Sequence, residues 1–499
     1  MFNGEVLAFI CYFAIVLGIG IFFFLKSKGG GEKEYFLGGR SMGPWVTAMS
    51  AQASDMSAWL LMGLPGSILA FGFGEVWIGI GLALGTAANW IFVAKRLRRF
   101  SAAANDSITL PQYLSNRFGK KHGALQMVSA LIFLVCFTVY VASAFVAGTK
   151  VFVRVFPSLD SGVAMLIFAA IILIYTFLGG YKAVCWTDFF QGLLMLVALL
   201  AIPIIAALSG EADSTLLSKT VVDAAGKEYA FGTNLFGSDW RDIVSGLAWG
   251  LGYFGMPHIL VRFMSIKSAK EVNKAATIAI IWVVLALGAV CVMAFLGRMI
   301  MGEALIMNGA QDTVFIEFAR KYFPGFVAGL LMSAIIAASM STADSQLLVA
   351  SSSFTSDIYK PVIRKNASDK ETLWIGRFVV IVVAVIAYFI ASSKAEGAQA
   401  IMNLVENAWA GFGSSFGPVV LLSVFWKRLT YKGALAGVVG GALVDVVWLV
   451  SGLSASTGIY ELVPGFVAGL IFTVVVTLID KKPSAETVAV FEAATTVEE

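Results

Sequence analysis

The sequence has 499 residues, of which 59% are hydrophobic and only 13% are charged, whereas about a quarter of a soluble domain is charged. Only helices and closed barrels satisfy their backbone polar groups in lipid, and the apolar stretches here reach about 20 residues, the length of a spanning helix. This composition excludes an ordinary soluble domain, and the small formal net charge of +4 gives no indication of a nucleic-acid partner. We therefore predict an all-α polytopic membrane protein.

Apolar windows predict about thirteen spans. Their centres lie near Ala14, Asp55, Ala83, Phe137, Ile171, Leu196, Tyr253, Leu285, Ile336, Val382, Phe412, Leu443 and Ile471. Basic residues are retained on the cytoplasmic side of a membrane. If the N-terminus is outside, most of the 35 Lys and Arg residues, including Arg98, Arg262 and Lys267, fall in cytoplasmic connections. We therefore predict an N-out, C-in topology.

The second predicted span contains a polar interruption, Ser50–Trp59, which is followed by Pro65 and Gly66. It places the Asp55 carboxylate near the middle of the bilayer, where a charge is expensive and usually marks a functional site. A helix that breaks here would free backbone carbonyls, which are good ligands for a hard cation such as sodium. The sequence therefore predicts a broken helix and a cation site at Asp55.

The seventh span is interrupted at Trp249–Pro257, where three glycines and a proline make a continuous helix improbable. Trp249, Tyr253 and Pro257 recur every four residues and would share one face of any helical part. Small residues beside large aromatic ones favour a shaped pocket. The alternative is that the glycines allow close helix packing and that the aromatic residues fill space.

A third polar segment, Ser333–Ser345, lies in the ninth span. Ser341 and Thr342 follow Ala338 by three and four residues, so both hydroxyls and that carbonyl can converge on one helix face. Neutral oxygens of this kind suit a monovalent cation that exchanges readily. Alternatively, the hydroxyls bond to carbonyls of their own helix.

These segments resemble the sodium/solute symporter family. The matching stretches are Tyr35–Ser41, Ser54–Gly66, Tyr175–Asp188, Trp249–His258 and Met340–Thr342. The resemblance implies the leucine-transporter-type fold, with two inverted five-helix repeats, and the five-span separation of the first two interruptions permits such repeats. The implied segments are an extra N-terminal helix at 1–30, repeats at 40–210 and 240–427, and two further helices at 428–481. The tail at 482–499 is polar, contains Pro483 and ends in acidic residues, so its composition predicts a disordered cytoplasmic extension.

The resemblance also implies a sodium site and a solute site. The expected sodium ligands are the carbonyls of Ala53, Met56 and Ala338 and the hydroxyls of Ser341 and Thr342, with Asp55 as a nearby charge. The expected solute contacts are Ser57, Tyr140, Trp249, Tyr253 and Pro257.

Two further residues are coupling candidates by the same resemblance. Arg40 is similar to a family residue that is important for coupling, although it would serve equally as a basic anchor at the cytoplasmic edge. Asp188, with Ser345, resembles part of a second cation site in some relatives, but Asp344 stands where those relatives carry a hydroxyl. His258 is interpreted as a packing or hydrogen-bonding residue.

The function implied is secondary active transport in the bacterial inner membrane, in which inward sodium movement drives uptake of a small solute by alternating access. The stretch Trp249–Gly255 points to proline rather than a sugar. The alternatives are another amino acid, a monocarboxylate, a sugar or a vitamin, or a channel or membrane sensor. The sequence has no Walker loop and no arrangement of nucleophile, base and oxyanion donors, so we predict neither an enzyme, an ATP-driven pump nor an organic cofactor.

Overall fold

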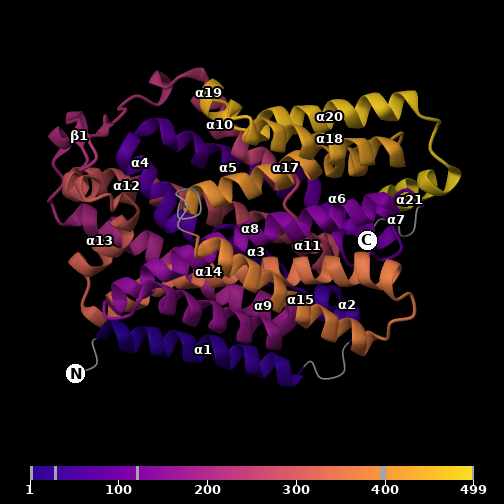
Figure 1. Cartoon of the computed structure of the whole chain (residues 1–499), viewed down its shortest axis with the longest axis horizontal. Coiled ribbons are helices and arrows are strands. Elements are labelled where there is room, and N and C mark those ends of the chain that lie inside the picture. The colour runs from indigo at the N-terminus through magenta and orange to yellow at the C-terminus, as the bar shows by residue number, and fades with distance from the viewer. Residues whose placement is uncertain (1–3, 27–30, 120–122, 394–400, 497–499) are drawn as a thin grey trace.

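The computed structural model describes residues 4–26, 31–119, 123–393 and 401–496, which are almost entirely helical. Long helices lie side by side along the longest axis, and the N- and C-terminal ends lie at opposite ends of that axis (Figure 1). The described strands are β1 (Val221–Val222) and β2 (Glu228–Tyr229), a short antiparallel pair in a long connection. The all-α prediction is confirmed, and the positions of the two ends fit an odd number of spans.

The α-helices are α1 (Gly4–Lys26), α2 (Glu32–Leu37), α3 (Pro44–Asp55), α4 (Leu64–Phe71), α5 (Val76–Ala88), α6 (Lys95–Ala103), α7 (Leu110–Asn116), α8 (Ala124–Val155), α9 (Ser161–Leu208), α10 (Trp240–Ala248), α11 (Pro257–Ser265), α12 (Val272–Met307), α13 (Val314–Tyr322), α14 (Gly325–Ser353), α15 (Asp369–Ala391), α17 (Ile401–Phe425), α18 (Tyr431–Val450), α19 (Leu453–Thr457), α20 (Leu462–Ile479) and α21 (Ala485–Thr496). The 3₁₀ or π-helical segments used below are η1 (Gly38–Arg40), η2 (Trp59–Gly63), η4 (Asn89–Ala94), η7 (Trp249–Phe254) and η10 (Phe354–Ile363).

Ten helices in the described ranges are long and apolar enough to cross a membrane, or eleven if the bent pair Trp240–Phe254 and Pro257–Ser265 is one span. The predicted spans near Asp55 and Ile171 fall on shorter pieces. The first is divided between α3 and the helix Trp59–Phe71, and the second lies in the first part of α9, before the chain breaks at Gly180. The structure therefore supports a many-helix membrane protein, while the number thirteen stays a prediction.

Gly180 explains why α9 is two helices rather than one. Its φ of 60° lies in the left-handed region, and a Cβ there would lie 2.9 Å from the Tyr35 ring. A glycine adopts this conformation without the steric cost that a side chain adds. The break falls inside the stretch Tyr175–Asp188, so this motif has a structural role at a helix boundary.

Both predicted helix interruptions are present. α3 begins with Pro44 and ends at Asp55, where Met56 leaves helical geometry with φ −81° and ψ 73°. In the second interruption η7 continues α10 to Phe254, and α11 begins at Pro257 after a bend of 42°. A proline suits the first turn of a helix because its missing N–H would have no intrahelical partner there.

The third polar segment lies on α14, which is continuous through Ser333–Ser345. This helix lies at the centre of the molecule and packs against α1, α3, α8 and α9. Its residues from Leu331 to Ser353 are all buried. The polar side chains of α14 therefore point into protein and need partners there.

The prediction of a disordered tail at 482–499 is wrong for residues 485–496, which form α21 and pack against α6. Arg117 Nη1 donates to the Thr487 carbonyl at 2.9 Å, and the Arg117 guanidinium lies 5.1 Å from the centre of the Phe491 ring. The polar composition of the tail hid this helix, because its stability depends on a buried arginine far away in the sequence.

Candidate ion and solute site

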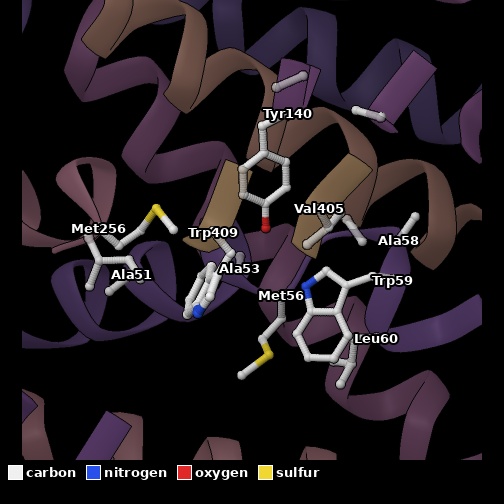
Figure 2. Close-up of a cluster of buried hydrophobic side chains, with 14 of the residues drawn as sticks. Ala51, Ala53, Met56, Ala58, Trp59, Leu60, Tyr140, Met256, Val405 and Trp409 are labelled. Carbon is white, nitrogen blue, oxygen red and sulfur yellow. The ribbon is translucent and has the colours of Figure 1, made fainter. Parts of the chain in front are cut away.

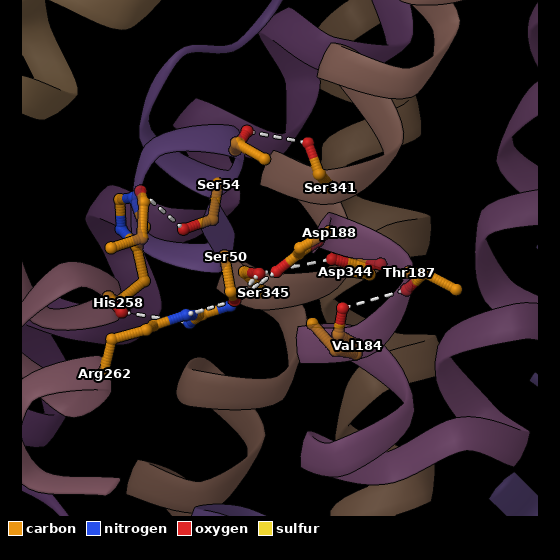
Figure 3. A network of polar contacts seen from close by, with 12 residues as sticks. Ser50, Ser54, Val184, Thr187, Asp188, His258, Arg262, Ser341, Asp344 and Ser345 are labelled. Atoms are coloured by element: carbon orange, nitrogen blue, oxygen red, sulfur yellow. Dashed lines mark hydrogen bonds and ion pairs between the residues drawn. The ribbon is translucent and has the colours of Figure 1, made fainter. Parts of the chain in front are cut away.

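A cluster of oxygen atoms forms where the end of α3 meets α14. Ser341 Oγ donates to the Ala53 carbonyl at 2.7 Å, and the Ala338 carbonyl lies 3.2 Å from the same hydroxyl. Figure 3 shows Ser341 on α14 facing the end of α3. The neighbouring Thr342 hydroxyl is buried without a hydrogen-bond partner among the described residues. Three of the five predicted sodium ligands therefore lie together, and a fourth has an unused oxygen.

The two predicted alternatives for Ser341 are both visible. Its hydroxyl lies within hydrogen-bonding distance of a carbonyl of its own helix, Ala338, as well as of Ala53 across the helix boundary. The Ala53 contact joins residues 288 positions apart in the sequence. A hydroxyl that only satisfied its own helix would not need this second partner.

The Asp55 carboxylate lies at the first break and is completely buried. Its Oδ2 accepts a hydrogen bond of 2.6 Å from the Tyr253 hydroxyl, while Oδ1 has no partner among the described residues. The predicted ion and solute residues are thus joined directly. A buried carboxylate with one free oxygen needs a further donor or a cation.

An aromatic cluster surrounds the second break. The Trp249 ring lies 5.3 Å from Tyr460 and 6.3 Å from both Trp59 and Trp409, measured between ring centres. Trp409 also packs edge-on against Tyr253 at 5.1 Å and donates from Nε1 to the Trp249 carbonyl at 2.9 Å. The predicted pair Trp249 and Tyr253 is therefore enclosed by residues from α3–α4, α17 and the segment before α20.

Tyr140 of α8 points toward the same region. Figure 2 shows its hydroxyl directed into the space between Trp409, Met56 and Trp59. The Tyr140 hydroxyl and Trp59 Nε1 are both buried, and the side chains of Ser57 and Trp59 lie next to the hydroxyl. Buried donors beside aromatic rings can hold a small polar solute with an apolar part.

Ser57 and Pro257 occupy the two breaks themselves. Ser57 is 2% exposed and lies just after Met56, and buried Pro257 begins α11. Among the described residues no hydrogen bond joins Ser57 or Pro257 to Trp249 or Tyr253, so the solute contacts of Ser57 and Pro257 stay predictions.

Sequence reasoning missed Trp409 and Tyr460. Trp409 lies inside an apolar span and Tyr460 in a loop, so neither shows a local signal. Gly252 is an indirect signal for Trp409, because a Cβ on Gly252 would lie 1.9 Å from Trp409 Nε1. The glycines of Trp249–Pro257 therefore serve both proposed purposes, since they permit close helix packing and bring aromatic rings together.

Asp188 belongs to a buried ionic network (Figure 3). Asp188 Oδ2 accepts from Ser50 Oγ at 2.6 Å and from Arg262 Nη2 at 3.1 Å. Arg262 Nη2 also donates to Ser345 Oγ at 2.5 Å, and Nη1 donates to the His258 carbonyl at 2.9 Å. Arg262 is 1% exposed. Its assignment to a cytoplasmic connection is therefore wrong, because the guanidinium joins α3, α9 and α14 in the core.

The second cation site suggested by Asp188 and Ser345 does not fit these residues. The Arg262 guanidinium contacts both side chains and takes the place that a second ion would need. Asp344 Oδ1 accepts from Ser345 Oγ at 3.3 Å. The positive charge between these helices thus belongs to the protein itself.

Arg40 lies in η1, at the end of the bundle opposite β1 and β2. It donates to Asp106 Oδ1 at 2.7 Å, to the Ser107 carbonyl at 2.9 Å and to the Met264 carbonyl. Burial acts to raise the pKa of Asp106, but the hydrogen bonds and charges of Lys33 and Arg40 outweigh it and lower that pKa. Arg40 therefore links the segment before α3 to the end of α11, at the ends of these helices that lie away from the two breaks.

These features define a class of protein. Two interrupted helices meet in the core of the bundle beside a buried carboxylate and a polar central helix, as in transporters built on broken helices. Solved structures share the fold. The substrate-bound, outward-open Na+-coupled sialic acid symporter aligns with a TM-score of 0.73 and 20% identity, over 96% of this chain and 99% of its own. Mhp1, a nucleobase-cation-symport-1 family transporter with bromovinylhydantoin bound, aligns with a TM-score of 0.56 and 15% identity, over 92% and 98% of the two chains. The class is a multi-pass membrane transporter with the leucine-transporter-type fold.

Sequence comparison gives the family. The model of the sodium:solute symporter family matches residues 35–441. The sodium/proline symporter of Haemophilus influenzae is 43% identical over 99% of this chain and 98% of its own. Sodium/proline symporter 2 of Staphylococcus saprophyticus is 43% identical over 95% and 93%, and the sodium/proline symporter of Staphylococcus aureus is 44% identical over 95% and 92%. The chain belongs to the sodium:solute symporter family, as the motifs predicted, and it is a multi-pass plasma-membrane transporter rather than an enzyme.

Proposed function

We propose that this protein couples inward sodium movement to the uptake of L-proline by alternating access. The names of relatives that are 43–44% identical over nearly the whole chain support both the ion and the solute. One structural observation carries the proposal. Tyr253 of the second broken segment donates to Asp55 at the first, next to the oxygen cluster of Ala53 and Ser341.

The proposed sodium site uses neutral oxygens near one buried charge. Its ligands are the carbonyls of Ala53, Met56 and Ala338 and the hydroxyls of Ser341 and Thr342. The cluster at Ser341 and the unused Thr342 hydroxyl support this assignment. Oxygen ligands of this type suit a hard cation. Asp55 supplies the negative charge that makes the buried position favourable for a cation.

The proposed solute site takes Ser57, Tyr140, Trp249, Tyr253 and Pro257, and we add Trp409. Proline combines an amine, a carboxylate and an apolar ring. Unpaired N–H groups at the ends of broken helices can hold the carboxylate. The aromatic rings around Trp249 can cover the proline ring.

The proposed coupling passes through Asp55. Sodium beside Asp55 would neutralise the charge that now depends on Tyr253, and so would alter the position of the second broken segment. Because the coupling of two binding equilibria is reciprocal, proline must tighten sodium binding by the same factor. One positive charge moving inward through 100 mV contributes about 2.3 kcal/mol to the transport work.

The proposed architecture has N-out, C-in orientation and inverted repeats at 40–210 and 240–427. The two breaks support it, because one lies near the start of each repeat. Asp188 and Arg40 are proposed as positioning residues, since both hold helices together rather than face the oxygen cluster.

Uptake by proteoliposomes tests the function. Labelled proline should accumulate when sodium is high outside and should only equilibrate when sodium is equal on both sides. Uptake driven equally well by a proton gradient without sodium would contradict sodium coupling. Saturable, sodium-driven uptake of another solute with which proline does not compete would show that proline is not the solute. The sodium-coupled mechanism would then still stand.

A further inference from the structure

The span Phe73–Ala103 ends in a group of basic residues that line a cavity. The cavity has a volume of about 380 Å³. Its walls are Ile91, Phe92, Lys95, Arg96, Arg99, Phe100, Phe425, Ala494 and Thr495. They come from the continuous span that holds η4 and α6, from the end of α17 and from α21, so three separate parts of the chain build this cavity. The proposed solute and ion residues do not take part in it.

Among the residues that the structure describes, no carboxylate neutralises the cations of this cavity. Across the described ranges no ion pair within 4.0 Å includes Lys95, Arg96 or Arg99, whereas Glu492 of α21 pairs with Lys427 at 2.6 Å. Arg96 is held in the wall, since Nη1 donates to the Val424 carbonyl at 3.0 Å and the guanidinium lies 4.4 Å from the Phe425 ring centre. Arg99 also lines the cavity, and its Nε is buried without a hydrogen-bond partner among the described residues. The cavity thus has positive charge, with one of its three cations fixed in the wall.

The cavity also lies at the boundary of the apolar surface. Ile91 is 60% exposed, Phe92 57% and Phe425 44%. Ile91 and Phe92 precede Lys95 by about one helical turn on the same span. A ligand here would meet hydrocarbon on one side and three cations on the other.

We propose that this cavity binds the phosphate-bearing headgroup of an anionic phospholipid, with the acyl chains on Ile91, Phe92 and Phe425. Arginine matches phosphate through parallel N–H donors, and lysine contributes a point charge. Basic residues are common at cytoplasmic helix ends for orientation alone. The convergence of three cations on one cavity and the fixed position of Arg96 separate this group from ordinary surface charge.

The experiment compares two charge-matched variants of the full-length protein. Lys95→Gln with Arg99→Gln removes two cavity cations that form no ion pair within the described part of the chain, and it keeps Arg96, which is bonded to the wall. Lys267→Gln with Lys270→Gln removes two exposed cations outside the cavity lining. These two lysines are close to α6, because Arg98 donates to the Lys267 carbonyl at 3.1 Å.

Binding is measured by native mass spectrometry and by the melting temperature in detergent, with phosphatidylglycerol, phosphatidylcholine and inorganic phosphate as separate probes. We expect phosphatidylglycerol to bind the wild type and the control variant equally, and the cavity variant about tenfold more weakly. Phosphatidylcholine should show little preference among the three proteins.

Three results would overturn the proposal. Equal binding of phosphatidylglycerol by the cavity variant would show that the cavity is not its site. An equal loss in the control variant would show a general effect of surface charge. An equal response of the wild type to inorganic phosphate would identify a free-anion site instead. None of these outcomes depends on sodium or proline, so they leave the proposed transport function untouched.

Discussion

At the scale of single residues, one hydroxyl at the oxygen cluster distinguishes ion binding from helix packing. Ser341 on α14 contacts Ala53 across the helix boundary, whereas Ser339, two residues earlier, donates at 2.9 Å to the Ile335 carbonyl of its own helix. Both are completely buried on α14. Ser339 is therefore a matched control for any substitution at Ser341.

Replacing Ser341 with alanine should raise the sodium concentration for half-maximal proline uptake by about tenfold, because a hydrogen-bonding partner of a charged group contributes about 1.5 kcal/mol. Ser339→Ala should leave it nearly unchanged. The measurement is initial uptake by proteoliposomes over a range of sodium concentrations. A similar increase in the half-maximal sodium concentration for both variants would show that Ser341 is not a sodium ligand.

The buried ion pair gives a second prediction at this scale. Arg262→Met leaves Asp188 without its counter-charge, and breaking a buried pair in this way costs about 3–5 kcal/mol. Asp188→Asn in the same chain should recover part of the loss, since the uncompensated charge is then gone. Melting temperatures of the single and double variants in detergent provide the measurement. A double variant no more stable than Arg262→Met would contradict the pairing.

At the scale of elements, the second break depends on the approach of η7 to α17. Gly252 faces Trp409, and Trp409 in turn holds the Trp249 carbonyl. The breaks in α3–α4 and α10–α11 were visible in the sequence because polar, glycine and proline residues weaken a helix locally. The packing of Trp409 against the second break was not visible in the sequence. An aromatic residue in an apolar span cannot be told from an ordinary core residue there.

Gly252→Ala should destabilise the protein by about 1–3 kcal/mol, the usual cost of overpacking, because the new methyl group would overlap Trp409 Nε1. Gly288→Ala on α12 is the control, as a Cβ there meets nothing within 4 Å. Adding Trp409→Phe to Gly252→Ala should give less destabilisation than the two single changes summed. Additive melting-temperature changes would show that the two positions are independent.

At the scale of the whole molecule, the two ends of the described chain lie at opposite ends of the bundle (Figure 1). This arrangement fits the predicted N-out, C-in topology, which the distribution of basic residues supports. The connection that carries β1 and β2 should then face outside, and α21 should face the cytoplasm. The buried Arg262 is not counted among the basic residues of the cytoplasmic connections.

Cysteine labelling tests the orientation. In a background without the four native cysteines, Ala225→Cys near β2 should react with an impermeant maleimide in intact cells. Thr496→Cys at the end of α21 should react only after the membrane is opened. Both positions are exposed, so the difference reports the side of the membrane. The opposite pattern would invert the predicted topology.

The sequence by itself determined the class, the family and the positions of the helix breaks. These features depend on local composition, on motifs that are continuous in the chain and on the cost of charge in lipid. Only the tertiary structure decided which distant groups meet. Tyr253 and Asp55 are 198 residues apart, Trp409 and Trp249 are 160 apart, and Arg262 and Asp188 are 74 apart. Such pairs form because buried polar groups must find partners in the packed core, and no local pattern records which partner packing supplies.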